Sequence, residues 1–188
     1  MAEVYNSFHN YVQYITPFDC DLWPDNPYLS SSGCSAGEPG VIYLTTRHPF
    51  PLAEAMVHEM AHMKLFSMGI GIEQADAIIE NSPHEMYYSP VKETERPMTA
   101  IFHAVYSFIH ILHLDNLVLK KEKGAQEWPA YLAMAKDTLA KMKYGCSIVV
   151  KNIKTSAEGK LFVQEFLNKA SKTMFETEQI IAAYETTG

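Results

Sequence analysis

The chain has little cysteine and no long hydrophobic run, and each absence excludes a class of protein. Cysteine accounts for 3 of its 188 residues. An odd number this small argues against a disulfide framework and suits a reducing cytosol. The start of the sequence lacks the basic and apolar regions of a signal peptide, and no stretch reaches the roughly 20 apolar residues of a membrane span. We therefore expect a cytoplasmic protein that does not cross a membrane.

Positive charge is scarce as well. Lys and Arg number 15 against 22 Asp and Glu, which gives a formal net charge of −7 at pH 7. No basic run is long enough to indicate a nucleic-acid surface. The short cluster from Lys120 to Lys123 falls where a helix is expected to end, and cations there suit the helix dipole. The sequence predicts no nucleic-acid partner, and it leaves the oligomeric state open.

Apolar residues are plentiful and recur mainly at helical spacing. They make up 47% of the chain, which is enough for a core, and the length predicts one domain over residues 1–188. A β-prone run at 41–45 needs a partner, which we expect from the segment before it. Apolar spacing and helix start and stop signals predict helices near residues 5–14, 52–68, 98–119, 128–144 and 156–177. We predict a mainly α, single-domain helical bundle with a small β element near the N-terminal third.

The sequence makes more specific predictions for one helix end, one helix start and one linker. Gly145 is expected to stop the helix before it. Thr155 is the expected N-cap of the next helix, with Glu158 completing a capping box. Between residues 70 and 96 the sequence predicts a long, partly irregular linker with a short helix around 74–80. A segment of this kind beside a site is often functional.

The most specific pattern is His58-Glu59-Met60-Ala61-His62. On a helix, residues four apart lie on one face with Cβ atoms roughly 5–6 Å apart, so His58 and His62 can hold one metal ion. Glu59 is rotated away from the pair and can approach a metal-bound water without being a ligand. The flanking residues are apolar on several sides, and a buried His or Glu needs a partner that a metal supplies. The motif predicts a metal site with Glu59 as its catalytic residue.

A catalytic metal usually has three protein ligands, so the pair predicts a third. The metzincin extension is absent, because Leu65 and Met68 stand where Gly and His would be needed. One apolar segment, 101–113, contains three histidines and is the richest source of a further ligand. A single helix can present one or two of them to one ion. The candidates for the third ligand are Glu73, Glu80, Glu85, His84, His103, His110 and His113.

Four blocks of sequence together resemble one known family. The blocks are Val57 to Leu65 around the motif, Tyr87-Tyr88-Ser89-Pro90, Glu95-Arg96-Pro97 and His103-Ala104-Val105-Tyr106. The combination is similar to the HExxH-motif proteins of biosynthesis clusters for ribosomally made, post-translationally modified peptides. Members of that family are understood as 2-oxoglutarate-dependent iron enzymes that β-hydroxylate residues of a precursor peptide. The likeness is good over roughly the central third of the chain and weak at its ends.

The resemblance implies that Fe(II) is bound by His58, His62 and His103, and that a precursor peptide is the substrate. A non-haem iron oxygenase needs facial protein ligands and open positions. The helix expected to carry His103 is apolar enough to pack against the motif helix, at about 8–10 Å between the axes. His110 and His113 would lie roughly 10–15 Å further along that helix. We therefore expect a three-histidine site in place of the usual two histidines and one carboxylate.

The resemblance also implies a site for the cosubstrate, 2-oxoglutarate. Its distal carboxylate needs a fixed cation, and an Arg offers a bidentate fork. Family members often have Trp-Arg where this chain has Val91 and Lys92, so Arg96 is the better candidate for this role and Lys92 the weaker one. Tyr106 lies one helical turn beyond the third histidine, where packing in the core is the favoured role and a hydroxyl contact the alternative.

Two other interpretations stay open on the residues alone. A zinc hydrolase, most simply a metallopeptidase, would use the same His pair with Glu59 as general base for the zinc-bound water. A non-enzymatic metal-binding or scaffold protein would keep the pair without the chemistry. The residues do not separate iron from zinc, because both metals suit the His pair. The absent metzincin extension and the family blocks favour the oxygenase.

Overall fold

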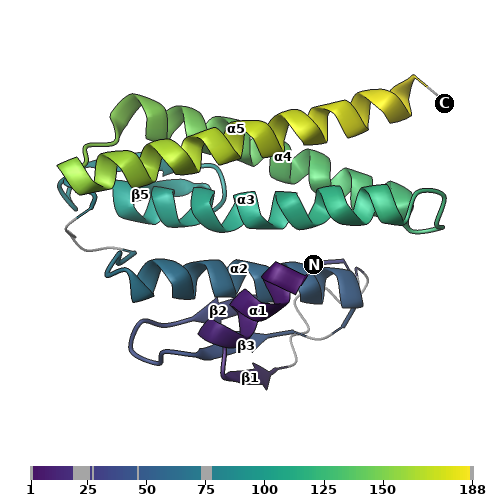
Figure 1. Ribbon diagram of the computed structural model, residues 1–188, viewed down its shortest axis with the longest axis horizontal. Helices are drawn as coiled ribbons and strands as arrows, with labels where there is room; N and C mark the ends of the chain where they lie inside the picture. Colours follow the sequence, from purple (N-terminus) through teal and green to yellow (C-terminus); the bar gives the residue numbers. More distant parts are fainter. Residues whose placement is uncertain (1, 19–25, 27, 46, 73–77, 187–188) are drawn as a thin grey trace. The chain divides into compact units, whose positions relative to one another are not determined.

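The computed structural model describes residues 2–18, 26, 28–45, 47–72 and 78–186. In this part of the chain, five helices and five short strands group into two compact units, Met1–Gly69 and Ile70–Gly188. Figure 1 shows both units, coloured along the sequence. Helices dominate, and a small sheet lies near the N-terminus, so the predicted mainly α fold is confirmed. The single catalytic domain stays a prediction.

The first unit consists of two helices and a three-stranded sheet. Its elements are α1 (Ala2–Tyr11), β1 (Tyr14–Pro17), β2 (Ser32–Cys34), β3 (Val41–Leu44) and α2 (Pro49–Ser67). The central strand is β3, with β1 parallel on one side and β2 antiparallel on the other. The predicted strand at 41–45 is confirmed as β3, and its expected partner is β2. β1 was not predicted, because its four residues are all exposed and show no alternation between apolar and polar.

The helix α2 begins earlier than the sequence predicted. It starts at Pro49 and ends at Ser67, against a predicted range of 52–68. Its N-cap is His48, whose Nδ1 accepts a hydrogen bond from the Phe50 N–H at 3.2 Å. A proline in the first turn lacks an N–H that would have no intrahelical partner there. The prolines therefore begin the helix and do not delay it.

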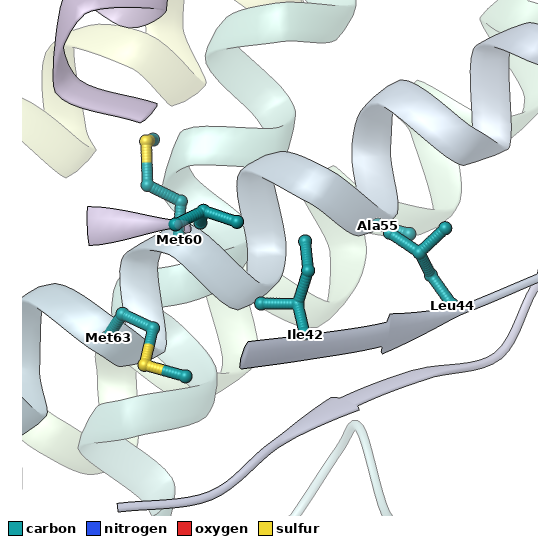
Figure 2. Packing of buried hydrophobic residues seen from close by; sticks show 6 residues of the cluster. Ile42, Leu44, Ala55, Met60 and Met63 are labelled. Atoms are coloured by element: carbon teal, nitrogen blue, oxygen red, sulfur yellow. The ribbon is translucent and has the colours of Figure 1, made fainter. Parts of the chain in front are cut away.

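The core of the first unit lies between α2 and the sheet. Figure 2 shows Ile42 and Leu44 of β3 beside Ala55, Met60 and Met63 of α2. All five side chains are buried, and burying a side chain such as Ile or Leu contributes about 1.5–3 kcal/mol. By helical spacing, the two histidines of the motif lie at one edge of this apolar face. The core thus fixes α2 on the sheet and leaves the histidines at its side.

The second unit consists of a β-hairpin and three long helices. Its elements are β4 (Met86–Ser89), β5 (Thr94–Pro97), α3 (Met98–Lys121), α4 (Trp128–Asn152) and α5 (Ala157–Glu185). The helices α3, α4 and α5 contact one another, and both strands contact α3 (Figure 1). The hairpin occupies part of the linker that was expected to be irregular. The short helix predicted at 74–80 falls largely outside the described residues.

The helix α4 continues past the end that the sequence predicted. It runs to Asn152, through Gly145, where the stop was expected. A Cβ on Gly145 would lie 2.6 Å from the Val105 Cγ2 of α3, closer than real Cβ atoms approach. The glycine therefore allows α3 and α4 to pack closely. The predicted stop was wrong because glycine serves tight packing as well as helix ends.

The helix α5 has a different cap and a different end from those predicted. Its N-cap is Ser156, whose Oγ accepts a hydrogen bond from the Gly159 N–H at 3.1 Å. The prediction of Thr155 as the cap was wrong by one position, because Ser and Thr both cap helices. Thr155 instead pairs with Ile79 in an isolated β-bridge. The helix ends at Glu185, beyond the predicted 177.

A buried amide connects the chain before the hairpin to the turn between α4 and α5. The Asn81 Nδ2 donates to the Asn152 carbonyl at 2.9 Å and to the Tyr87 hydroxyl at 3.1 Å. Its Oδ1 accepts from the Lys154 N–H at 2.7 Å. Each such bond contributes about 0.5–1.5 kcal/mol. Together they hold the hairpin that contains Arg96 against the helices.

The helix α3 is long and apolar enough to cross a membrane, by length and composition alone. It is the one helix among the described residues with this property. More than half of its apolar window is buried inside the protein. Such burial is typical of the core helix of a soluble protein.

Candidate metal centre

The two histidines of the motif present their ring nitrogens to each other. The Nε2 atoms of His58 and His62 lie 3.1 Å apart, and the two rings are nearly perpendicular at 86°. Both side chains are half-buried on α2. Two nitrogens that each lie about 2.0–2.1 Å from one metal ion are about 3.0–3.4 Å apart at ordinary coordination angles. The observed separation therefore fits a pair of ligands on one ion.

Glu59 lies beside this pair and is held by the sheet. Its side chain is 2% exposed, and its Oε1 accepts a hydrogen bond from the Ser32 Oγ of β2 at 2.6 Å. The same Oε1 lies 4.0 Å from the His58 Nε2. With an ion bound by the pair, this carboxylate would lie near enough to a metal-bound water to orient it or to accept its proton. The sequence did not single out Ser32, because it precedes Glu59 by 27 residues and no local pattern links them.

A cysteine of the same strand also reaches the motif. The Cys34 Sγ donates to the Glu59 carbonyl oxygen at 3.9 Å. Burial raises the pKa of the Cys34 thiol above its usual range, and the nearby charge of Glu59 raises it further. The thiol therefore stays protonated at neutral pH. A protonated thiol acts as a weak donor to the helix and is a poor metal ligand.

In the second unit, His103 is buried in α3 and bonded to the chain before the hairpin. Its Nε2–H donates to the Ile70 carbonyl at 2.9 Å. Burial lowers the pKa of His103 from 6.5 to about 4, although the bond to Ile70 opposes this shift. The ring is therefore neutral at physiological pH, which is the form that binds metals. A backbone carbonyl on one ring nitrogen also fixes the ring, as is common for a metal-binding histidine.

The other predicted residues of the second unit differ in burial. Arg96 is half-buried on β5, whereas Lys92 is exposed in the turn of the hairpin. The Tyr106 ring packs against Phe162 and Phe166 of α5, with ring centroids 6.2 and 5.3 Å away. These contacts give Tyr106 a packing role, the one that the sequence favoured over a hydroxyl contact.

The structure brings one part of the predicted site together. His58, His62 and Glu59 meet in the first unit, whereas His103 and Arg96 lie in the second. Among the described residues, no group of three or more His, Cys, Asp or Glu side chains is arranged to hold a metal. The role of His103 as third ligand therefore stays a prediction, as do the cosubstrate contacts.

Comparison with known proteins adds no relative. The chain matches no model of a known protein family, and a search of curated proteins found no match. The resemblance seen in the sequence therefore stays an expectation. Function is therefore inferred from the residues and their geometry.

Proposed function

We propose that this protein is an Fe(II)- and 2-oxoglutarate-dependent oxygenase that β-hydroxylates a residue of a ribosomally made precursor peptide. The observation that supports a metal enzyme is the meeting of the His58 and His62 Nε2 atoms at 3.1 Å beside the buried carboxylate of Glu59. The choice of an oxygenase rests on the resemblance of the sequence blocks. A cytoplasmic location is part of the proposal, because a reducing compartment keeps iron as Fe(II) and thiols free.

The chain's own residues would divide the work at such a centre. The bound iron would supply the activation of oxygen together with 2-oxoglutarate. His58 and His62 would hold the metal through their Nε2 atoms, and the neutral imidazole of His103 would be the third ligand. Glu59, fixed by its bond to Ser32, would orient the bound water or a histidine. The peptide substrate would lie beside this group.

The cosubstrate would be held by the segment before α3. The distal carboxylate of 2-oxoglutarate would pair with the guanidinium of Arg96, which is half-buried. Partial burial strengthens such a pair relative to one in water. Lys92 is exposed, so solvent screens its charge more, and its ion pair with that carboxylate would be weaker. Tyr106 would contribute mainly through the packing of its ring against Phe166.

One observation favours a second candidate, a zinc metallopeptidase. The Glu59 carboxylate is buried, fixed by Ser32 and 4.0 Å from the His58 Nε2. A general base for a zinc-bound water needs a carboxylate in this kind of place. Both candidates use the His pair, so a single substitution at Glu59 can separate them.

The substitution Glu59→Gln is expected to lower oxygenase activity by roughly 10–100-fold, because it removes an orienting group and keeps both histidines. A peptidase would lose about 100–10,000-fold, because its general base is gone. The measurement is anaerobic purification, metal analysis, and oxygen-dependent turnover of 2-oxoglutarate alongside a peptide-cleavage assay. Retention of metal in the variant is expected in both cases.

Glu38→Gln is the matched control for this test, because Glu38 is an exposed carboxylate of the same unit. It should leave both metal content and turnover at the wild-type level. Peptide cleavage by the wild type that requires zinc and ignores 2-oxoglutarate would overturn the oxygenase proposal. A wild type that binds neither metal would overturn both candidates.

The substitution Arg96→Ala is expected to raise the apparent KM for 2-oxoglutarate by about 30-fold or more. Loss of one desolvated, bidentate ion pair costs about 2–5 kcal/mol. Steady-state turnover at varied 2-oxoglutarate measures the effect, and iron content should be unchanged. Lys92→Ala, in the same hairpin, is the control and should change the KM little. A large effect in Lys92→Ala with none in Arg96→Ala would move the role to Lys92.

A further inference from the structure

The two outer strands of the first unit's sheet each have β3 on one side. The sheet order is β1-β3-β2. On its other side, an outer strand has backbone N–H and C=O groups that a further extended chain can pair with. The hydrogen bonds to β3 and to the neighbouring loop show which residues turn their backbone N–H and C=O groups to the outer edge. The outer edges of β1 and β2 differ in the residues that they present.

The outer edge of β1 is blocked by a proline. The Tyr14 N–H donates to the Gly40 carbonyl at 3.0 Å, and the Phe18 N–H donates to the Leu44 carbonyl at 3.1 Å. The even-numbered residues of this stretch therefore turn their backbone N–H and C=O groups toward β3. The odd-numbered residue Pro17 turns its backbone to the outer edge. Proline has no N–H to offer to a further strand. Natural sheets protect their edges in this way.

Among the residues that the structure describes, no proline blocks the outer edge of β2. The Thr45 N–H donates to the Ser31 carbonyl at 3.0 Å, so this pair faces inward. Bonded and non-bonded pairs alternate along an antiparallel ladder, and Gly33 is therefore the next residue that bonds to β3. Ser32 and Cys34 turn their backbone N–H and C=O groups to the outer edge. Each of them has an N–H to donate.

The same two residues contact the candidate metal centre through their side chains. The Ser32 Oγ donates to the Glu59 Oε1 at 2.6 Å, and the Cys34 Sγ lies 3.9 Å from the Glu59 carbonyl oxygen. The Glu59 Oε1 is 4.0 Å from the His58 Nε2. A chain paired with this edge would therefore run directly beside the catalytic carboxylate. Alternate side chains of that chain would point toward the α2 side of the sheet.

We propose that the peptide substrate binds in extended form as an added strand on the outer edge of β2, paired with the backbone of Ser32 and Cys34. This inference rests on the proposed function, because it names how the peptide of that site is held. Main-chain pairing supplies affinity, and the alternate side chains supply specificity. A second copy of the protein is a poorer occupant, because a stable interface buries about 800 Å² per partner and β2 has three residues.

The test uses a peptide selected on the wild-type protein from a randomised 12-residue library displayed on phage. The best binder is synthesised with one backbone amide methylated at a time. Methylation removes one N–H donor, so we expect binding to weaken about tenfold or more at every second position of a short stretch and little in between. The peptide scan leaves the protein unchanged, so it does not depend on any variant folding.

A pair of protein variants locates the binding edge. Cys34→Pro removes an outward N–H at a position where an edge strand accepts proline, and it should weaken binding about tenfold or more. Cys34→Ala keeps that N–H and should bind more tightly than Cys34→Pro. Ile15→Pro makes the same change on the edge of β1 and should leave binding at the wild-type level. Circular dichroism checks that each variant is folded.

The outcomes separate this inference from the proposed function. Absence of a two-residue alternation, failure of the library to give any binder, or loss of binding in Ile15→Pro but not in Cys34→Pro would overturn the edge of β2 as the docking site. Metal content and 2-oxoglutarate turnover of the wild type are measured in parallel. Normal values there with no alternation would refute the docking site alone, and alternation without metal or turnover would refute the proposed enzyme alone.

Discussion

Replacing either His58 or His62 by Ala is expected to remove iron from the purified protein and to abolish turnover of 2-oxoglutarate. The two Nε2 atoms lie 3.1 Å apart and act as a pair, so one imidazole alone leaves the ion without its chelate. The loss should exceed the roughly 10–100-fold that removing a residue behind a metal ligand costs. The helix itself should persist, because Ala has the highest helix propensity. Elemental analysis and far-UV circular dichroism measure the two effects.

The matched control for these variants is His84→Ala. His84 is exposed and follows a proline before the hairpin, so its removal should change neither iron content nor turnover. Full iron occupancy in both His58→Ala and His62→Ala would contradict the metal site. Equal loss of iron in His84→Ala would make His84, one of the candidates in the sequence, the third ligand in place of His103.

Replacing His103 by Ala is expected to lower iron affinity by a similar amount. The sequence predicts His103 as the third ligand, and its ring is neutral and fixed by the Ile70 carbonyl, as a ligand requires. The measurement is an anaerobic iron titration of the purified variant. His110→Ala is the control, because His110 lies on the same helix with its Nδ1 bonded to the Tyr106 carbonyl at 2.9 Å. Unchanged affinity in His103→Ala would assign the third position to another residue.

The pH dependence of the stability of the metal-free protein tests the burial of His103. Its pKa is about 4 in the folded protein against 6.5 ordinarily. Below pH 6.5 the unfolded chain therefore binds a proton that the folded protein does not, so stability falls as the pH drops from 6.5 towards 4. The total loss is about 3 kcal/mol, and above pH 6.5 this group has no effect. Urea unfolding at several pH values measures it, and the His103→Ala variant should lack this component.

The sequence predicted those features that depend on residues close together in the chain. The helix around the motif follows from apolar spacing, and the meeting of His58 with His62 follows from residues four apart sharing a face. The helix begins at Pro49, three residues before the predicted Leu52, because prolines suit a first helical turn. The hairpin before α3 was not predicted, because Pro90 indicates an irregular segment and no residue type marks the positive φ that the turn requires at Glu93.

Contacts between distant residues could not be predicted from one sequence. Ser32 and Glu59 are 27 residues apart, and Ile70 and His103 are 33 residues apart. Neither pair belongs to a repeat or a periodic pattern, so no spacing rule connects them. Gly145 shows the same limit, because its role depends on Val105 of another helix. The sequence thus named candidate residues for the chemistry, but it did not indicate the residues that position them.

The protonated state of Cys34 has a consequence for the lifetime of an oxygen-using centre. Oxidants attack the thiolate form of cysteine much faster than the thiol. Cys34 lies against the backbone of Glu59, and burial and the charge of Glu59 keep its pKa above the usual range. Uncoupled turnover at an iron centre can release reactive oxygen species. The nearby Cys34 thiol would react with them slowly. In the proposed oxygenase, Cys34 would therefore be a slow site of oxidative self-inactivation.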